Sequence, residues 1–118
     1  MQDKIVINDY IENDPLSEEN LDKTLETVNR FRLSFPQKTI WLYSGYNYQK
    51  VMRQLPNLAT KDNYNMYKRQ QIIKQCDVMV DGKYIDSQRD ITLKWRGSLN
   101  QRVIDLKQSL DKVVLYCD

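Results

Sequence analysis

The stretch KTIWLYSG, residues 38–45, decides the fold. Ile40 and Leu42 alternate with Trp41 and Tyr43, which is the two-residue period of a β-strand, and Ser44–Gly45 mark its end. Helical patterns flank this strand on both sides, and a further strand pattern lies beyond each of them. The order strand, helix, strand, helix, strand is typical of an α/β fold with a mostly parallel sheet.

The segment before this strand contains one strand pattern and one helical pattern. Lys4–Tyr10 opens with the β-branched run IVI, which predicts a buried strand, and the turn residues of IENDP follow it. Ser17 is placed to cap a helix that Pro36 ends. The apolar positions of this helix recur every three or four residues, at Leu21, Leu25, Val28, Phe31 and Phe35.

The segment after residue 45 alternates in the same way. A short helix begins at Asn47 and ends at Pro56, and a second helix is predicted over Met66–Gln75. Val78–Val80 predicts a third strand, and Val113–Cys117 predicts a final one. Because ligands of parallel α/β sheets bind beside the carboxyl ends of the strands, the stretches ENDP, SGY and DGKY mark the predicted binding edge.

Residues 81–105, DGKYIDSQRDITLKWRGSLNQRVID, show neither a helical nor a strand period, and we call this segment the cap. It is rich in side chains that form hydrogen bonds. Two interpretations fit these side chains equally: contact with a partner or cofactor, or hydrogen bonds that hold the loop together, with glycines in its turns. The residues concerned are Asp81, Gly82, Arg96, Asn100 and Gln101.

Composition limits the chemistry. The 118 residues are the size of one domain, spanning 1–118, and they include no histidine, the commonest general base and metal ligand. Cys76 and Cys117 are expected to be buried free thiols, with a disulfide between them as the alternative. No apolar run is long enough to cross a membrane, and the N-terminus lacks a signal-peptide pattern, so a cytoplasmic protein is expected.

Basic residues are concentrated in the middle of the chain. Residues 38–110 carry thirteen basic and six acidic side chains, whereas residues 1–37 carry four and eight. An anionic ligand, nucleic acid or an acidic partner would suit such a surface, but an ordinary solvated surface is the simpler interpretation. The run YNMYKRQQ, residues 64–71, is interpreted as a helix surface, so nucleic acid is not expected. Trp41 and Trp95 are expected in the core.

Several stretches carry a resemblance to a known family: IVINDYIENDPLSEENL, KTIWLYSGY, CDVMVDGKYIDSQRDITLKWRGSLNQRVIDLKQSL and KVVLY. Together they resemble the C-terminal two thirds of the activating proteins of the anaerobic ribonucleoside-triphosphate reductase. The resemblance covers nearly the whole chain. It implies a truncated, incomplete radical-SAM-like partial barrel, with the cap near the active site or the reductase-binding face.

The resemblance also implies a chemistry. Members of this family hold a [4Fe–4S] cluster in a Cys-x3-Cys-x2-Cys loop, bind S-adenosylmethionine at its open iron, and generate a radical that removes hydrogen from a glycine of the reductase. Neither Cys76 nor Cys117 belongs to such a motif, so no cofactor is expected in this chain. The cofactor-binding residues that the resemblance leaves in place are Asp14, Pro15, Ser44 and Gly45. A plain turn is the simpler interpretation of the last two.

The turn that contacts the methionine part of the cofactor in this family is altered here. Glu12 and Asn13 stand where the family has two glycines, and the added bulk and charge predict weak binding of S-adenosylmethionine.

Three functions remain open. The first is a degenerate, non-catalytic relative that binds a protein partner, either the reductase or an activating protein, with a homodimer also compatible. The second is the C-terminal piece of a split activating enzyme whose cluster-binding piece is a separate chain. The third is an unrelated role in binding an anionic ligand or nucleic acid. The altered turn favours the first function over the second, because a split enzyme would still need that turn.

Overall fold

The computed structural model describes residues 3–54, 60–109 and 112–116. The described strands form one four-stranded sheet in the order β1–β2–β3–β4. β1 (Lys4–Val6), β2 (Thr39–Ser44) and β3 (Val78–Asp81) run parallel, and β4 (Arg102–Asp105) pairs antiparallel with β3. The predicted α/β class with a mostly parallel sheet is therefore confirmed, while the radical-SAM-like partial barrel stays a prediction.

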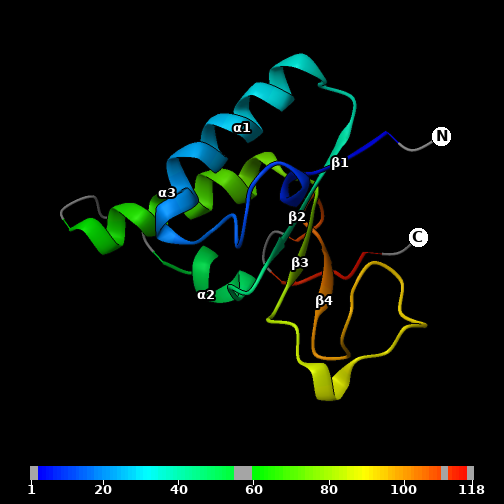
Figure 1. The fold of residues 1–118 in the computed structure, drawn as a ribbon. Coiled ribbons are helices and arrows are strands. Elements are labelled where there is room, and N and C mark those ends of the chain that lie inside the picture. The colour runs from blue at the N-terminus through cyan, green and yellow to red at the C-terminus, as the bar shows by residue number, and fades with distance from the viewer. Residues whose placement is uncertain (1–2, 55–59, 110–111, 117–118) are drawn as a thin grey trace.

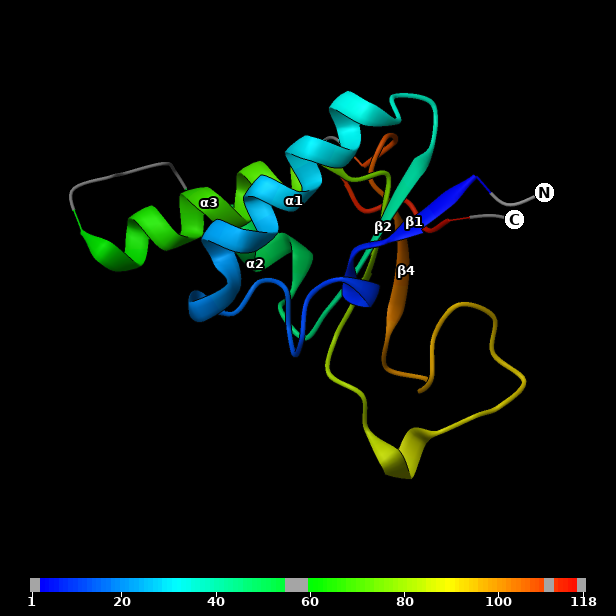
Figure 2. The same cartoon turned by 45° about the horizontal axis from the view of Figure 1, so that its top comes forward.

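The α-helices of the described residues lie on one face of this sheet (Figure 1). α1 (Leu21–Ser34) connects β1 to β2, and α2 (Tyr48–Met52) and α3 (Lys61–Gln75) connect β2 to β3. α1 and α3 lie side by side (Figure 2). The main core lies between these helices and the sheet, because every second residue of β2, Ile40 and Leu42, turns its side chain toward them.

The opposite face of the sheet carries a smaller, aromatic core around Trp41, Val78 and Val80. Trp95 of the cap and Tyr116 of the C-terminal segment cover it, with ring centroids 5.2 Å and 5.0 Å from the Trp41 ring. Trp41 is buried, as predicted, and Trp95 is partly exposed. β2 is thus buried on both faces, which explains its almost continuous apolar sequence.

The fourth strand lies where the sequence predicted none, at the end of the cap. Residues 102–105 contain only two apolar side chains, Val103 and Ile104, too few to show a period, and antiparallel pairing with β3 supplies the rest. The predicted final strand over Val113–Cys117 was wrong for the described part. There, one bridge joins Leu115 to Ile104 at the outer edge of β4, and Cys117 lies outside the described residues.

Several predicted boundaries also differ. The predicted strand over Lys4–Tyr10 ends at Val6, because residues 7–9 form a 3₁₀ turn. α3 begins at Lys61 rather than at the predicted Met66, because the Thr60 side chain accepts a hydrogen bond from the Asn63 N–H and caps the helix.

The boundaries of α1 and α2 can also be compared with the prediction. Ser17 does not cap α1 as predicted; its hydroxyl donates to the Asp14 carbonyl, and a 3₁₀ turn over residues 18–20 leads into the helix. α1 ends at Ser34, just before Pro36, as the sequence predicted. α2 ends at Met52, and its predicted end at Pro56 lies outside the described residues.

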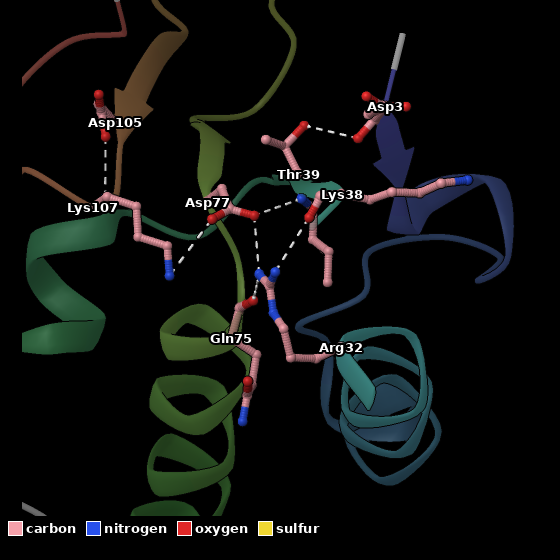
Figure 3. Close-up of polar contacts among 9 residues, drawn as sticks. Asp3, Arg32, Lys38, Thr39, Gln75, Asp77, Asp105 and Lys107 are labelled. Atoms are coloured by element: carbon pink, nitrogen blue, oxygen red, sulfur yellow. Dashed lines mark hydrogen bonds and ion pairs between the residues drawn. The ribbon is translucent and has the colours of Figure 1, made fainter. Parts of the chain in front are cut away.

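Asp77 joins several elements at the start of β3 (Figure 3). Its Oδ2 accepts the Ile40 N–H at 2.8 Å and an Arg32 N–H at 2.9 Å, and its Oδ1 lies 3.5 Å from the Lys107 ammonium. The Arg32 guanidinium also donates to two backbone carbonyls, those of Lys38 and Gln75. One ion pair therefore holds α1, the end of α3 and the first residues of β2 and β3 together.

We expect Arg32→Ala to lower the free energy of unfolding by about 2–3 kcal/mol, because it leaves the mostly buried Asp77 carboxylate with weaker compensation. Arg30→Ala is the matched control on the same helix. It removes only an exposed pair, 3.8 Å from Glu26, and should change the free energy by less than about 0.5 kcal/mol. Urea unfolding of both variants checks this, and equal losses would contradict the role given to Arg32.

Candidate functional site

Asp14 ties the turn before α1 to the carboxyl end of β2. The Ser44 hydroxyl donates to its Oδ1 at 2.9 Å, and the Gly45 N–H donates to its Oδ2 at 2.8 Å. The Leu16 N–H also donates to Oδ1, at 2.9 Å, and Pro15 is buried beside it. The structure thus brings Asp14, Ser44 and Gly45 together, and the hydrogen bonds between them fix the shape of this edge of the sheet.

The turn itself keeps a backbone shape that suits glycine. Asn13 has a φ of 64°, in the left-handed region, where asparagine is better tolerated than most residues. The Asn13 and Glu12 side chains are exposed. The position of the expected second glycine therefore has a backbone conformation that glycine adopts freely, and the added bulk stands at the surface.

A surface pocket of about 340 Å³ lies between this turn, the end of β2 and the start of the cap. Its lining includes the polar residues Asn13, Ser44, Lys83 and Gln101. A Cβ added at Gly45 would lie only 2.8 Å from Cγ of Lys83. The Lys83 side chain therefore covers Gly45, at the point where a glycine would let a ligand approach the backbone closely.

Asp81 is a buried carboxylate at the base of the cap, with 2% of its surface exposed. Arg102 binds it with two parallel hydrogen bonds of 2.9 Å and 2.6 Å, and the Tyr48 N–H donates to it at 2.8 Å. The hydrogen bonds that Arg102 donates to the Asp81 carboxylate raise the pKa of Arg102. These three donors join β3, β4 and α2, so Asp81 holds the framework of the site.

The other predicted polar residues of the cap bind one another. The Gln101 amide donates to the Gly82 carbonyl at 3.0 Å, and Gly82 has a φ of 99°. The Asn100 amide donates to the Lys83 carbonyl at 2.8 Å, and the Arg96 guanidinium donates to the Leu99 and Gln101 carbonyls. These side chains shape the loop from within, as the second interpretation of the sequence required. Contact of these residues with a partner stays a prediction.

The cap exposes large apolar side chains that the sequence analysis did not single out. Ile91, Leu99 and Tyr84 are 84%, 56% and 51% exposed. Surface side chains of this kind occur singly on most proteins, but here, with Ile85 included, four of them lie within sixteen positions of one hydrogen-bonded loop. The sequence did contain a signal for this exposed surface: the apolar residues lie in a segment that shows neither a helical nor a strand period.

Cys76 does not fit the role of a cluster ligand. Only 1% of its surface is exposed, and burial raises the pKa of its thiol to about 12, with the neighbouring Asp77 carboxylate acting in the same direction. It is a free, buried thiol, as predicted, while Cys117 lies outside the described residues. In the part of the chain that the structure describes, no three His, Cys, Asp or Glu side chains are grouped to hold a metal ion.

Helix length and polarity bear on membrane insertion. Among residues 3–54, 60–109 and 112–116, no helix combines the length and the apolar character that crossing a bilayer requires.

Comparison with known proteins identifies the class. Residues 13–104 match the sequence model of the family described as a 4Fe-4S single cluster domain, and the chain belongs to this family. No solved structure shows a significant match. The 118 residues themselves contain two cysteines, fewer than the three thiolates of the expected cluster loop.

More specific similarity is to anaerobic ribonucleoside-triphosphate reductase-activating proteins, which confirms the resemblance. The chain is 39% identical to that of Vibrio cholerae over 88 residues, covering 75% of this chain and 48% of the relative. It is 34% identical to that of Escherichia coli K12 over 94 residues, covering 80% and 52%. Enterobacteria phage T4 has a relative that is 32% identical over 92 residues, covering 76% and 47%. The chain thus spans about half the length of these relatives.

We expect Asn13→Gly to leave the free energy of unfolding unchanged or slightly higher, because glycine adopts the left-handed backbone freely. Asn13→Val should lower it by about 1–2 kcal/mol. Glu12→Gly is the control. The Glu12 backbone is not left-handed, so glycine there gives no conformational advantage, and the greater flexibility of the unfolded chain should lower the free energy of unfolding by about 0.5–1 kcal/mol. Thermal unfolding measures all three, and a wild-type melting temperature for Asn13→Val would contradict the turn conformation.

We expect Cys76 to be unreactive in the folded chain. In a Cys117→Ser background at pH 8, Ellman's reagent should modify native Cys76 about a thousandfold more slowly than the urea-unfolded chain, because a pKa of about 12 instead of 9.0 lowers the thiolate fraction. Equal rates in the two states would show that the thiol is accessible and free to bind a metal.

Proposed function

We propose that this chain binds a protein partner through its cap and does not by itself perform radical chemistry. The proposed partner is the anaerobic ribonucleotide reductase or an activating protein of that reductase, because the relatives carry that name. The observation that carries the proposal is the cap, which combines an internally hydrogen-bonded frame with exposed apolar side chains.

The frame makes the cap suitable for docking. Gln101 and Asn100 fix the two ends of the loop, and a bridge between Arg89 and Ser98 joins its two sides. A loop held in this way loses little conformational entropy on binding. The free energy gained from apolar contacts at Ile91 or Leu99 would therefore be offset only slightly by the cost of ordering the loop.

The state of the cysteines supports a role in binding. A [4Fe–4S] cluster with an open iron needs three thiolates, and the described residues offer one deeply buried thiol. The residues that match the family therefore serve in this proposal as a scaffold and a partner surface.

A second candidate function is the C-terminal piece of a split activating enzyme. The left-handed Asn13 and the Asp14–Ser44–Gly45 contacts support it, because they order the edge of the sheet to which the resemblance assigns cofactor binding. The two functions are distinguished by adding a separately expressed chain with a Cys-x3-Cys-x2-Cys loop. A glycyl radical formed on the reductase only when both chains are present would decide for the split enzyme.

We expect Ile91→Asp to weaken partner binding at least tenfold, because a carboxylate would replace an apolar contact at the interface. Leu33→Asp is the matched control, since Leu33 is 85% exposed on α1, outside the cap, against 84% for Ile91. The measurement is biolayer interferometry with the reductase and with its activating protein, each immobilised in turn. Failure of the wild-type chain to bind either one contradicts the proposal, and equal losses in both variants contradict the assignment to the cap.

A further inference from the structure

A second pocket, of about 570 Å³, lies between α2 and the residues that follow β4. It shares no described residue with the cap or with the Asp14 turn. The residues of its lining that matter for recognition are three basic side chains and two apolar ones: Lys50, Arg53, Lys112, Met52 and Val113.

The charge of this pocket is not balanced from within. Its described lining contains no aspartate or glutamate, and none of the ion pairs between described residues involves Lys50, Arg53 or Lys112. Lys50 and Arg53 are three positions apart along the helical turn, so they project to the same side. Three cations around one hollow produce a local positive potential that attracts a multivalent anion.

The walls of the pocket are held in place. The Tyr48 hydroxyl donates to the Ser109 carbonyl at 2.8 Å, which joins α2 to the segment after β4. The Gln70 amide donates to the carbonyls of Val51 and Gln54 at 2.9 Å and 2.6 Å, which fixes the other end of α2. A ligand would therefore meet a preformed site.

We propose that this pocket binds the polyphosphate group of a nucleotide-sized ligand. Three cations match a chain of phosphates better than a single carboxylate, and the volume lies within the range of small-molecule sites. A nucleic-acid strand would need a continuous groove with exposed aromatic rings for stacking. The aromatic residue here, Tyr48, is only 8% exposed. This inference does not depend on the proposed function.

The test is isothermal titration calorimetry with sodium tripolyphosphate and, separately, with ATP, at low ionic strength. We expect one saturable site for each probe and an affinity that falls as salt is added. The double variant Lys50→Gln/Arg53→Gln should bind both at least tenfold more weakly. The double variant Lys74→Gln/Arg30→Gln is the control, because it removes one exposed lysine and one exposed arginine elsewhere and should bind as the wild type does.

Three results would overturn the inference: no saturable binding of either probe up to about 1 mM, equal weakening in the two double variants, or binding of ATP without binding of tripolyphosphate. A single-stranded oligonucleotide serves as the third ligand. If it binds through Lys50 and Arg53 while tripolyphosphate fails to displace it, the site is for nucleic acid and the inference is wrong. Near-UV circular dichroism of each variant confirms that the fold is intact.

Discussion

A carboxylate with almost no access to water constrains this fold more than any other group. The buried Asp81 carboxylate accepts two hydrogen bonds from Arg102 and a third from the first N–H of α2, which offset the cost of its burial. Since these donors come from β4 and from α2, which are far apart in the chain, the hydrogen bonds to this one carboxylate fix the register of β4, the base of the cap and the position of α2 together. The candidate edge beside Gly45 and the cationic pocket beside α2 both lie next to this anchor.

Much of the architecture could be predicted because it rests on local apolar patterns. The alternation of Ile40 and Leu42 with Trp41 predicted β2, and the three-and-four spacing after Ser17 predicted α1. The prediction failed where a partner far away in the chain supplies the stabilisation. β4 has two apolar residues and depends on β3 for its hydrogen bonds, and the early start of α3 depends on a Thr60 cap before a polar first turn.

The candidate site was predictable to a similar extent. The carboxyl ends of parallel strands meet at one edge, so Asp14 and Ser44 were expected near each other from topology alone. No sequence pattern indicated that Lys83 would cover Gly45, or that Gln101 would direct its hydrogen bonds back to Gly82. Such contacts depend on the path of a loop, and loop paths follow from many weak interactions that leave no period in the sequence.

Both tryptophans of the chain lie in the small aromatic core, one on β2 and one on the cap, with ring centroids 5.2 Å apart. Trp95 holds this position with a φ of 71°, an unfavourable backbone for a bulky side chain, so the surrounding contacts must compensate for it. The tryptophan emission of the protein therefore arises entirely from the junction of cap and sheet. A change in how the cap packs against the sheet should therefore change the tryptophan fluorescence, which can be measured without an added dye.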